Sequence, residues 1–117
     1  MFERYSFVAV KTRDLARARR FWADALGFPV TEEKPGDFFM VKAGGLRLCV
    51  DLAAGKRHKP GGSDPVIGLK VTSVKDVLAK LAAFGISPFE GRSASAGGEY
   101  AQIKDPDGRT VILTETD

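Results

Sequence analysis

Apolar and polar residues follow one order twice along this chain. Residues 7–11 alternate in an aromatic and β-branched context that predicts a strand, and residues 66–71 repeat this pattern. A helix is predicted after each strand, because Asp14 and Ser73 can cap the free backbone N–H groups and a glycine ends each segment. The apolar stripes at helical spacing are Leu15, Ala18, Phe21, Trp22, Ala25 and Leu26 in the first helix, and Val74, Val77, Leu78, Leu81 and Phe84 in the second.

Three short strands are predicted after each helix, because turn signals divide the remaining chain. The clearest signal is Asp105-Pro106-Asp107-Gly108, which has the Asp, Pro and Gly positions of a type I turn. The glycine-rich segment 91–98 is predicted to be a loop, either a flap over a pocket or a simple connection. The predicted strands are 28–33, 37–42 and 46–52 in the first half, and 86–91, 99–104 and 110–115 in the second.

This repetition predicts an α+β fold in which one domain, 1–117, contains two βαβββ modules. We expect the modules at 1–52 and 66–117, with a linker rich in Gly, Pro and Lys at 53–65. A sheet with one helix leaves its other face uncovered. We therefore expect the two mixed sheets to curve into a cup, with the helices on the outer face and room for a small molecule inside.

The composition fits one ordinary soluble domain and indicates its setting. The chain has 117 residues, of which 44% are hydrophobic and 28% are charged. Cys49 is its one cysteine, which excludes an intramolecular disulfide and favours a reducing compartment. There is no apolar run of roughly 20 residues and no start typical of a signal peptide. We therefore expect a cytoplasmic protein with no membrane partner.

The net charge of +3 is a mild basic excess and does not by itself indicate a nucleic-acid partner. Part of the excess lies in the predicted first helix and part in the run 56–59 of the predicted linker. Neither region has the interleaved aromatic residues of a base-stacking surface. Both are interpreted as solvated faces, and nucleic-acid binding is not expected.

Four stretches in order carry a family resemblance. They read FVAVKTRDLARARRFWADALGF at 7–28, GGLRLCVDL at 44–52, VIGLKVTSVKDVLAKLAAFGI at 66–86 and DPDGRTVILTE at 105–115. Together they resemble the vicinal oxygen chelate superfamily of glyoxalases, bleomycin resistance proteins and extradiol dioxygenases. The resemblance implies paired βαβββ modules and a homodimer, with each cup formed within one chain or across two.

Metal-dependent members of this superfamily hold a divalent ion with four side chains that project into the cup. The resemblance places these positions at Phe7, Cys49, Val66 and Ile112. Only the cysteine can donate to a metal, and a single thiolate does not hold a catalytic ion. The chain therefore departs from the metal-binding pattern, and we expect no metal, no cofactor and no catalytic residue.

Strand alternation indicates which side chains would line the cup. This wall is apolar and aromatic at its centre and positively charged toward its ends, which suits a flat or hydrophobic molecule. The alternative, that the apolar residues fill a closed core, stays open. The predicted ligand-binding residues are Tyr5, Phe7, Lys11, Phe38, Met40, Arg47, Cys49, Val66, Lys70, Tyr100 and Ile112.

Two residues with reactive side chains have simpler interpretations. His58, the one histidine, lies between Arg57 and Lys59 in the predicted linker, so an exposed residue is favoured over a metal ligand or general base. Without a Gly-x-Ser-x-Gly turn, a serine triad has no presented nucleophile. Cys49 would be reactive only if nearby cations lowered its pKa, and a passive buried thiol is favoured.

The leading functional hypothesis is a metal-independent small-molecule-binding protein similar to the bleomycin resistance members. It would bind or sequester a hydrophobic or aromatic compound, neutral or anionic, because the chain is mildly basic. The alternative is an enzyme, a glyoxalase-like lyase or isomerase or a dioxygenase, with displaced metal ligands or metal-free acid–base chemistry. That chemistry would use Glu99, Asp51, Tyr100 or Lys11.

Overall fold

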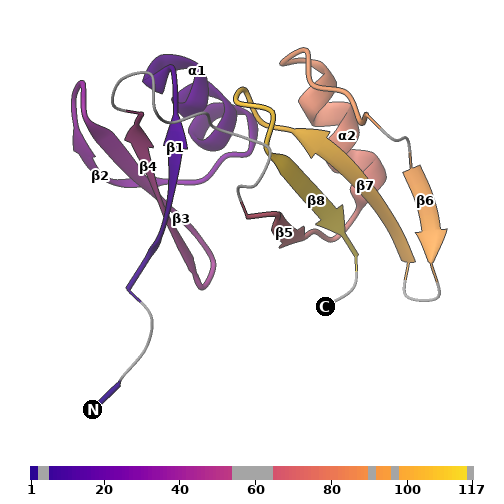
Figure 1. Ribbon diagram of the computed structural model, residues 1–117. Coiled ribbons are helices and arrows are strands. Elements are labelled where there is room, and N and C mark those ends of the chain that lie inside the picture. Colours follow the sequence, from indigo (N-terminus) through magenta and orange to yellow (C-terminus); the bar gives the residue numbers. More distant parts are fainter. Residues whose placement is uncertain (3–5, 54–64, 90–91, 96–97, 116–117) are drawn as a thin grey trace. The chain divides into compact units, whose positions relative to one another are not determined.

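The computed structural model divides the chain into two compact units, Met1–Pro60 and Gly61–Asp117 (Figure 1). The residues that the structure describes are 1–2, 6–53, 65–89, 92–95 and 98–115. The predicted linker lies mostly outside these residues, so the module boundaries at 1–52, 53–65 and 66–117 stay predictions.

The first unit is a four-stranded sheet with one helical segment. Its strands run in the order β1-β4-β3-β2, in which β1 is parallel to β4 and the other neighbours are antiparallel. The elements are β1 (Val8–Thr12), α1 (Leu15–Arg19), the π-helix η1 (Arg20–Ala25), β2 (Val30–Lys34), β3 (Phe38–Ala43) and β4 (Leu46–Leu52).

The second unit repeats this arrangement. Its strand order is β5-β8-β7-β6, again with one parallel pair, β5 and β8. The elements are β5 (Ile67–Lys70), α2 (Val74–Ala82), β6 (Arg92–Ser95), β7 (Gly98–Lys104) and β8 (Thr110–Thr114). The predicted α+β fold of two βαβββ modules with mixed sheets is thus confirmed, whereas the cup between them stays a prediction.

The helices begin and end where the sequence predicts. The Asp14 side chain accepts from the Arg17 N–H at 3.1 Å, and the Ser73 hydroxyl accepts from the Asp76 N–H at 3.1 Å. After the helices the backbone turns at Gly27 with φ +77° and at Gly85 with φ +76°. Only glycine adopts this conformation without a Cβ penalty, which explains why both helices stop there.

The first helix departs from regular geometry in its second half. The Leu26 N–H donates to the Phe21 carbonyl at 2.9 Å, which is the i→i−5 bond of a π-helix. The wider turn still leaves Phe21, Trp22 and Ala25 buried. This change of winding was not predicted, because an apolar stripe shows which face is buried and not how many residues each turn contains.

The prediction is wrong for residues 86–89 and 92–95. The described residues 86–89 form no strand: Pro88 lacks an N–H, and the Phe89 N–H donates to the Gln102 carbonyl at 3.0 Å. The fourth strand of the unit, β6, lies instead at Arg92–Ser95, within the predicted loop 91–98. It pairs antiparallel with β7, and its small and polar residues gave no apolar alternation to detect.

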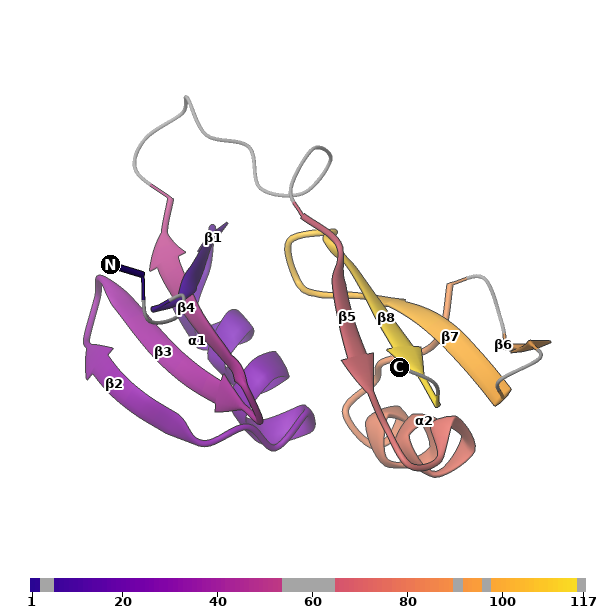
Figure 2. The same ribbon diagram turned by 90° about the horizontal axis from the view of Figure 1, so that it is seen from below.

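Each unit has its own core between one sheet face and its helix (Figure 2). In the first unit the buried aromatic side chain of Trp22 packs against the ring of Phe21, with centroids 5.0 Å apart, and stacks with that of Phe28 at 6.4 Å. The buried apolar residues on the sheet face toward the helix are Val10, Phe39, Val41, Leu48 and Val50 in the first unit, and Ile67, Ala101, Ile103, Val111 and Leu113 in the second. Among the described residues, no helix is long and apolar enough to cross a membrane.

A buried ion pair stabilises the turn between β7 and β8. The Gly108 N–H donates to the Asp105 carbonyl at 3.0 Å, as the predicted type I turn requires. The Asp105 carboxylate also accepts from the Arg109 backbone N–H at 2.8 Å and pairs with the Arg109 guanidinium, and both side chains are almost completely buried. Burial raises the pKa of the Asp105 carboxyl, while the bonds from Arg109 oppose that change.

Candidate functional site

The predicted lining residues of the first unit lie together on one sheet face. The register pairs Ala9 with Cys49 and Cys49 with Met40, while it pairs Lys11 with Asp51 and Asp51 with Phe38. Directly paired residues share a face, and the alternate residues on these strands are the buried ones that face α1 and η1. We call the opposite face, which has no helix, the helix-free face of the first unit. Its described residues are Ala9, Lys11, Glu32, Phe38, Met40, Lys42, Arg47, Cys49 and Asp51.

A chain of polar contacts crosses this face. The Cys49 thiol donates to Asp51 Oδ1 at 3.6 Å, and Asp51 Oδ2 lies 3.5 Å from Lys11 Nζ. Burial, and then the negative charges of Asp51 and Glu32, raise the pKa of Cys49 from its ordinary 9.0 to about 11, against a smaller lowering by Lys11. The thiol is therefore protonated at neutral pH, which makes it a weak nucleophile and a weak metal ligand.

The second unit has an equivalent helix-free face. Gly68 pairs with Ile112 and Ile112 with Gln102, while Lys70 pairs with Thr114 and Thr114 with Tyr100. The alternate residues of these strands, such as Ile67 and Val111, are buried on the face that α2 covers. The predicted residues Lys70, Tyr100 and Ile112 therefore share one face, as strand alternation indicated.

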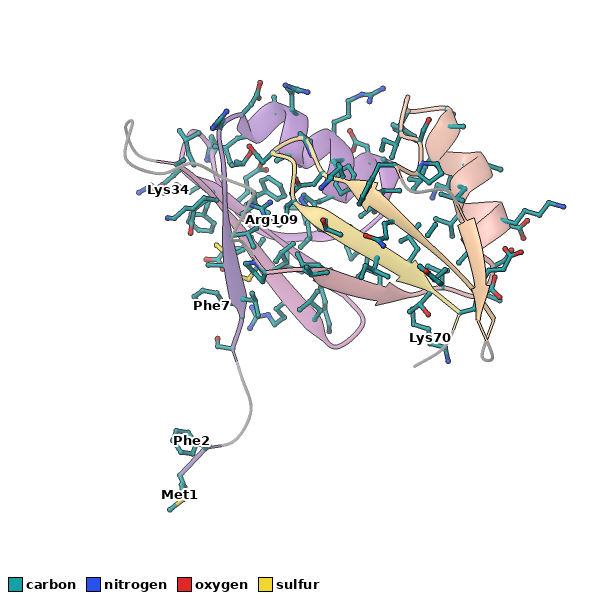
Figure 3. The ribbon with its side chains drawn as sticks, turned by 45° about the vertical axis from the view of Figure 1, so that its right-hand side comes forward. Met1, Phe2, Phe7, Lys34, Lys70 and Arg109 are labelled. Atoms are coloured by element: carbon teal, nitrogen blue, oxygen red, sulfur yellow. The ribbon has the colours of Figure 1, made fainter. Side chains whose placement is uncertain are left out.

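The residues that directly precede the opening strands β1 and β5 are exposed. Phe7, just before β1, is 50% exposed, and Val66, just before β5, is 58% exposed. Figure 3 shows Phe7 at the start of β1 and Lys70 at the end of β5. Met40 and Cys49, by contrast, are buried. Tyr5 and His58 lie outside the described residues, so the predictions for them stay untested.

Described residues of the first unit line surface depressions at two of its turns. One, of about 510 Å³, is lined by Thr31, Lys42, Gly44, Gly45 and Arg47 at the β3–β4 turn. Its volume falls in the range of small-molecule sites, roughly 300–1,000 Å³. The other, of about 220 Å³, lies by the β2–β3 turn and is lined by Leu15, Ala16, Arg19, Glu33, Lys34, Pro35, Gly36, Phe38 and Phe39.

Lys42 and Thr31 were not among the predicted residues, although Arg47 was. Lys42 follows Phe38 and Met40 at the same alternation on β3, so extending that alternation by one step would have found it. Thr31 lies where the register of β2 shifts between Val30 and Glu32. Hydrophobic alternation cannot reveal such an irregularity, because one extra residue in the strand moves the side chains after it to the opposite face of the sheet.

The candidates for acid–base chemistry separate into different surroundings. Lys11 and Asp51 form an ion pair on the helix-free face of the first unit. Tyr100 lies on the helix-free face of the second unit. Glu99 lies on the opposite face, because it is two residues from buried Ala101 on β7. The Glu99 backbone N–H donates to Glu115 Oε1 at 3.4 Å.

Metal-ligand chemistry is sparse in the described part of the chain. Among those residues, no three His, Cys, Asp or Glu side chains are grouped so that they could hold an ion. The four positions that the resemblance assigned to metal ligands hold the side chains of Phe7, Cys49, Val66 and Ile112. Three of the four have no donor atom, and the thiol of the fourth has a raised pKa.

Comparison with protein families gives one match along most of the chain. The model described as Glyoxalase/Bleomycin resistance protein/Dioxygenase superfamily matches residues 4–113. Comparison with curated proteins gave no significant match.

Solved structures share the fold at low sequence identity. A glyoxalase family protein from Enterococcus faecalis is 23% identical with a TM-score of 0.77, covering 96% of this chain and 97% of that one. An antibiotic binding protein from a Streptomyces species is 23% identical with a TM-score of 0.79, covering 99% and 98%. A lactoylglutathione lyase from Agrobacterium tumefaciens is 19% identical with a TM-score of 0.73, covering 97% and 93%. At these identities the likeness concerns the fold alone.

Proposed function

Because the chain belongs to the glyoxalase, bleomycin resistance protein and dioxygenase superfamily, we propose that it binds a small molecule without metal and without altering it. The bound compound is hydrophobic or aromatic, and neutral or anionic. The antibiotic binding protein with the same fold is described by its ability to bind, whereas the lactoylglutathione lyase is an enzyme, so the fold is compatible with either class.

The observation that carries the proposal is the chemistry of the helix-free faces. Phe38, Met40 and Cys49 occupy neighbouring strands on one of them, and Ile112 and Tyr100 lie on the other. Apolar and aromatic walls with a few polar groups are typical of sites that hold drug-sized molecules. The protonated thiol of Cys49 adds polarizable, unreactive surface to such a wall.

The second candidate is an enzyme of the same superfamily, and the Lys11–Asp51 pair favours it. An amine and a carboxylate at 3.5 Å could pass a proton to and from a bound compound. In that case the compound would leave changed, whereas in the leading proposal it is recovered intact. This difference separates the two candidates by experiment.

The test is a thermal-shift screen of aromatic acids and planar antibiotics, followed by mass spectrometry of each compound that raises the melting temperature. A ligand at a hundred times its Kd stabilises the folded chain by about 2.7 kcal/mol. We expect at least one aromatic compound to raise the melting temperature and to be recovered at its original mass. Recovery of a product, in an amount exceeding the protein, would replace the binding proposal with the enzyme.

A matched variant identifies the surface that binds. Phe38→Gln on the helix-free face should weaken the shift, because Phe38 is partly exposed there and the change introduces a polar group where the ligand makes apolar contact. Lys75→Gln on α2, an exposed residue of the second unit, serves as the control. An equal shift in both variants would contradict the assignment to the helix-free face of the first unit.

Light scattering would test the homodimer that the family resemblance implies.

A further inference from the structure

Two positive charges face each other on the helix-free face of the first unit. Lys42 on β3 and Arg47 on β4 are direct cross-strand partners, next to the β3–β4 turn. Side chains in such a pair start from Cβ atoms about 5 Å apart, and like charges at this position destabilise the sheet. A protein that keeps this arrangement has a local excess of positive potential that an anion would neutralise.

The described acidic residues of the helix-free face do not form ion pairs with Lys42 or Arg47. Asp51 lies further along β4 and forms its ion pair with Lys11. Glu32 lies beside Met40 on β2, and in the described part of the chain no carboxylate comes within ion-pair distance of Lys42 or Arg47. The Arg47 guanidinium instead lies 3.5 Å from the Met40 sulfur. Both cations therefore remain available to a bound anion.

The surrounding surface gives an anion room to approach. Lys42 and Arg47 line the depression of about 510 Å³ together with Thr31, Gly44 and Gly45. A Cβ atom at either glycine would meet no other atom within 4 Å, so the backbone of this turn borders open space. Gly44 has φ +59°, a conformation that glycine adopts without a Cβ penalty.

We propose that Lys42 and Arg47 bind the carboxylate of an aromatic acid, whose ring lies in the depression that these two residues line. This inference rests on the proposed binding function and names the chemical class of its ligand. The planar guanidinium matches a carboxylate through two parallel N–H bonds, and the ammonium adds a point charge. The Met40 sulfur accepts a hydrogen bond from the Arg47 guanidinium at 3.5 Å, which helps to hold the guanidinium beside the depression.

The experiment compares 2-naphthoate with the neutral 2-naphthamide by isothermal titration of the full chain. The two compounds have the same ring system and differ in charge. We expect naphthoate to bind about tenfold more tightly than naphthamide, because a hydrogen bond to a charged group increases affinity by about this factor. Lys42→Gln with Arg47→Gln should remove this preference, by lowering the affinity for naphthoate to about that for naphthamide. Lys75→Gln, on the exposed surface of α2, should keep it.

The outcomes separate this inference from the binding function itself. Equal affinity of the wild-type chain for acid and amide would overturn the carboxylate site while the binding proposal stands. If neither compound binds, acetate titration observed by NMR decides: saturable shifts of the Gly44 and Gly45 amides that vanish in the double variant support the anion site, and their absence overturns it. Circular dichroism of each variant confirms that it is folded.

Discussion

The state of the Cys49 thiol is the most direct physical prediction from the candidate site. Burial and the neighbouring carboxylates raise its pKa from 9.0 to about 11. At pH 8 a thiol with the ordinary value has about one molecule in ten as thiolate, whereas the raised value leaves about one in a thousand. Because the thiolate is the nucleophile, native Cys49 should react about a hundredfold more slowly than the unfolded chain, before any further slowing by burial.

The assay is alkylation by iodoacetamide, followed by intact-mass spectrometry over a pH series. We expect the native rate to rise with pH up to about 11, while the urea-unfolded chain reaches its plateau near the ordinary pKa. After burial, the negative charge of Asp51 is the largest cause of the raised pKa. Asp51→Asn removes this charge, so the alkylation rate of Cys49 at pH 8 should increase. Lys75→Gln serves as an unaffected control.

The raised pKa of Cys49 also makes the stability of the folded chain depend on pH. The folded chain holds the Cys49 proton more tightly than the unfolded chain, so this contribution is complete below about pH 9 and is lost as the pH rises toward 11. A native alkylation rate equal to that of the unfolded chain at pH 8 would contradict the raised pKa of Cys49. It would mean that Cys49 is a thiolate or is freely accessible, and either would reopen a reactive role for it.

Three substitutions test the contacts that hold the second unit, each by the free energy of unfolding from urea denaturation. Arg109→Leu leaves the buried Asp105 carboxylate without its partner and should destabilise by about 3–5 kcal/mol; a loss below 1 kcal/mol would contradict the buried pair. Glu115→Gln removes the charge that accepts from the Val74 N–H at 2.8 Å and should cost about 1 kcal/mol at low salt and less at high salt; a cost that salt leaves unchanged would exclude the helix-dipole term. Gly85→Ala places a Cβ at φ +76° and should cost about 1–2 kcal/mol, although no atom lies within 4 Å, so an unchanged stability would show that the backbone relaxes.

Most of the fold could be predicted because each element has a local physical signal. Asp14 and Ser73 cap helices, glycines end them, and alternation placed β3 and β4 within one residue. The strand at 92–95 could not be predicted, since its residues have no apolar alternation and its position depends on pairing with β7. The π-helical turn was also missed, because the same stripe fits either winding.

The face of each candidate residue was predictable, but its surroundings were not. Alternation placed Lys11, Met40, Arg47 and Cys49 on one helix-free face, as the register shows. The pairing of Lys42 with Arg47 depends on the length of the β3–β4 turn. The raised pKa of Cys49 depends on burial and on charges from two other positions. These quantities arise only when the strands are in register.

Metal-independent binding is tested by measuring whether the affinity for a ligand depends on a bound divalent ion. The chain is purified without chelator, its metal content is measured by inductively coupled plasma mass spectrometry, and its affinity for the strongest-binding aromatic acid is measured before and after EDTA treatment. We expect no stoichiometric metal and an affinity that EDTA leaves unchanged. A divalent ion at near-unit occupancy, whose removal abolishes binding, would contradict it.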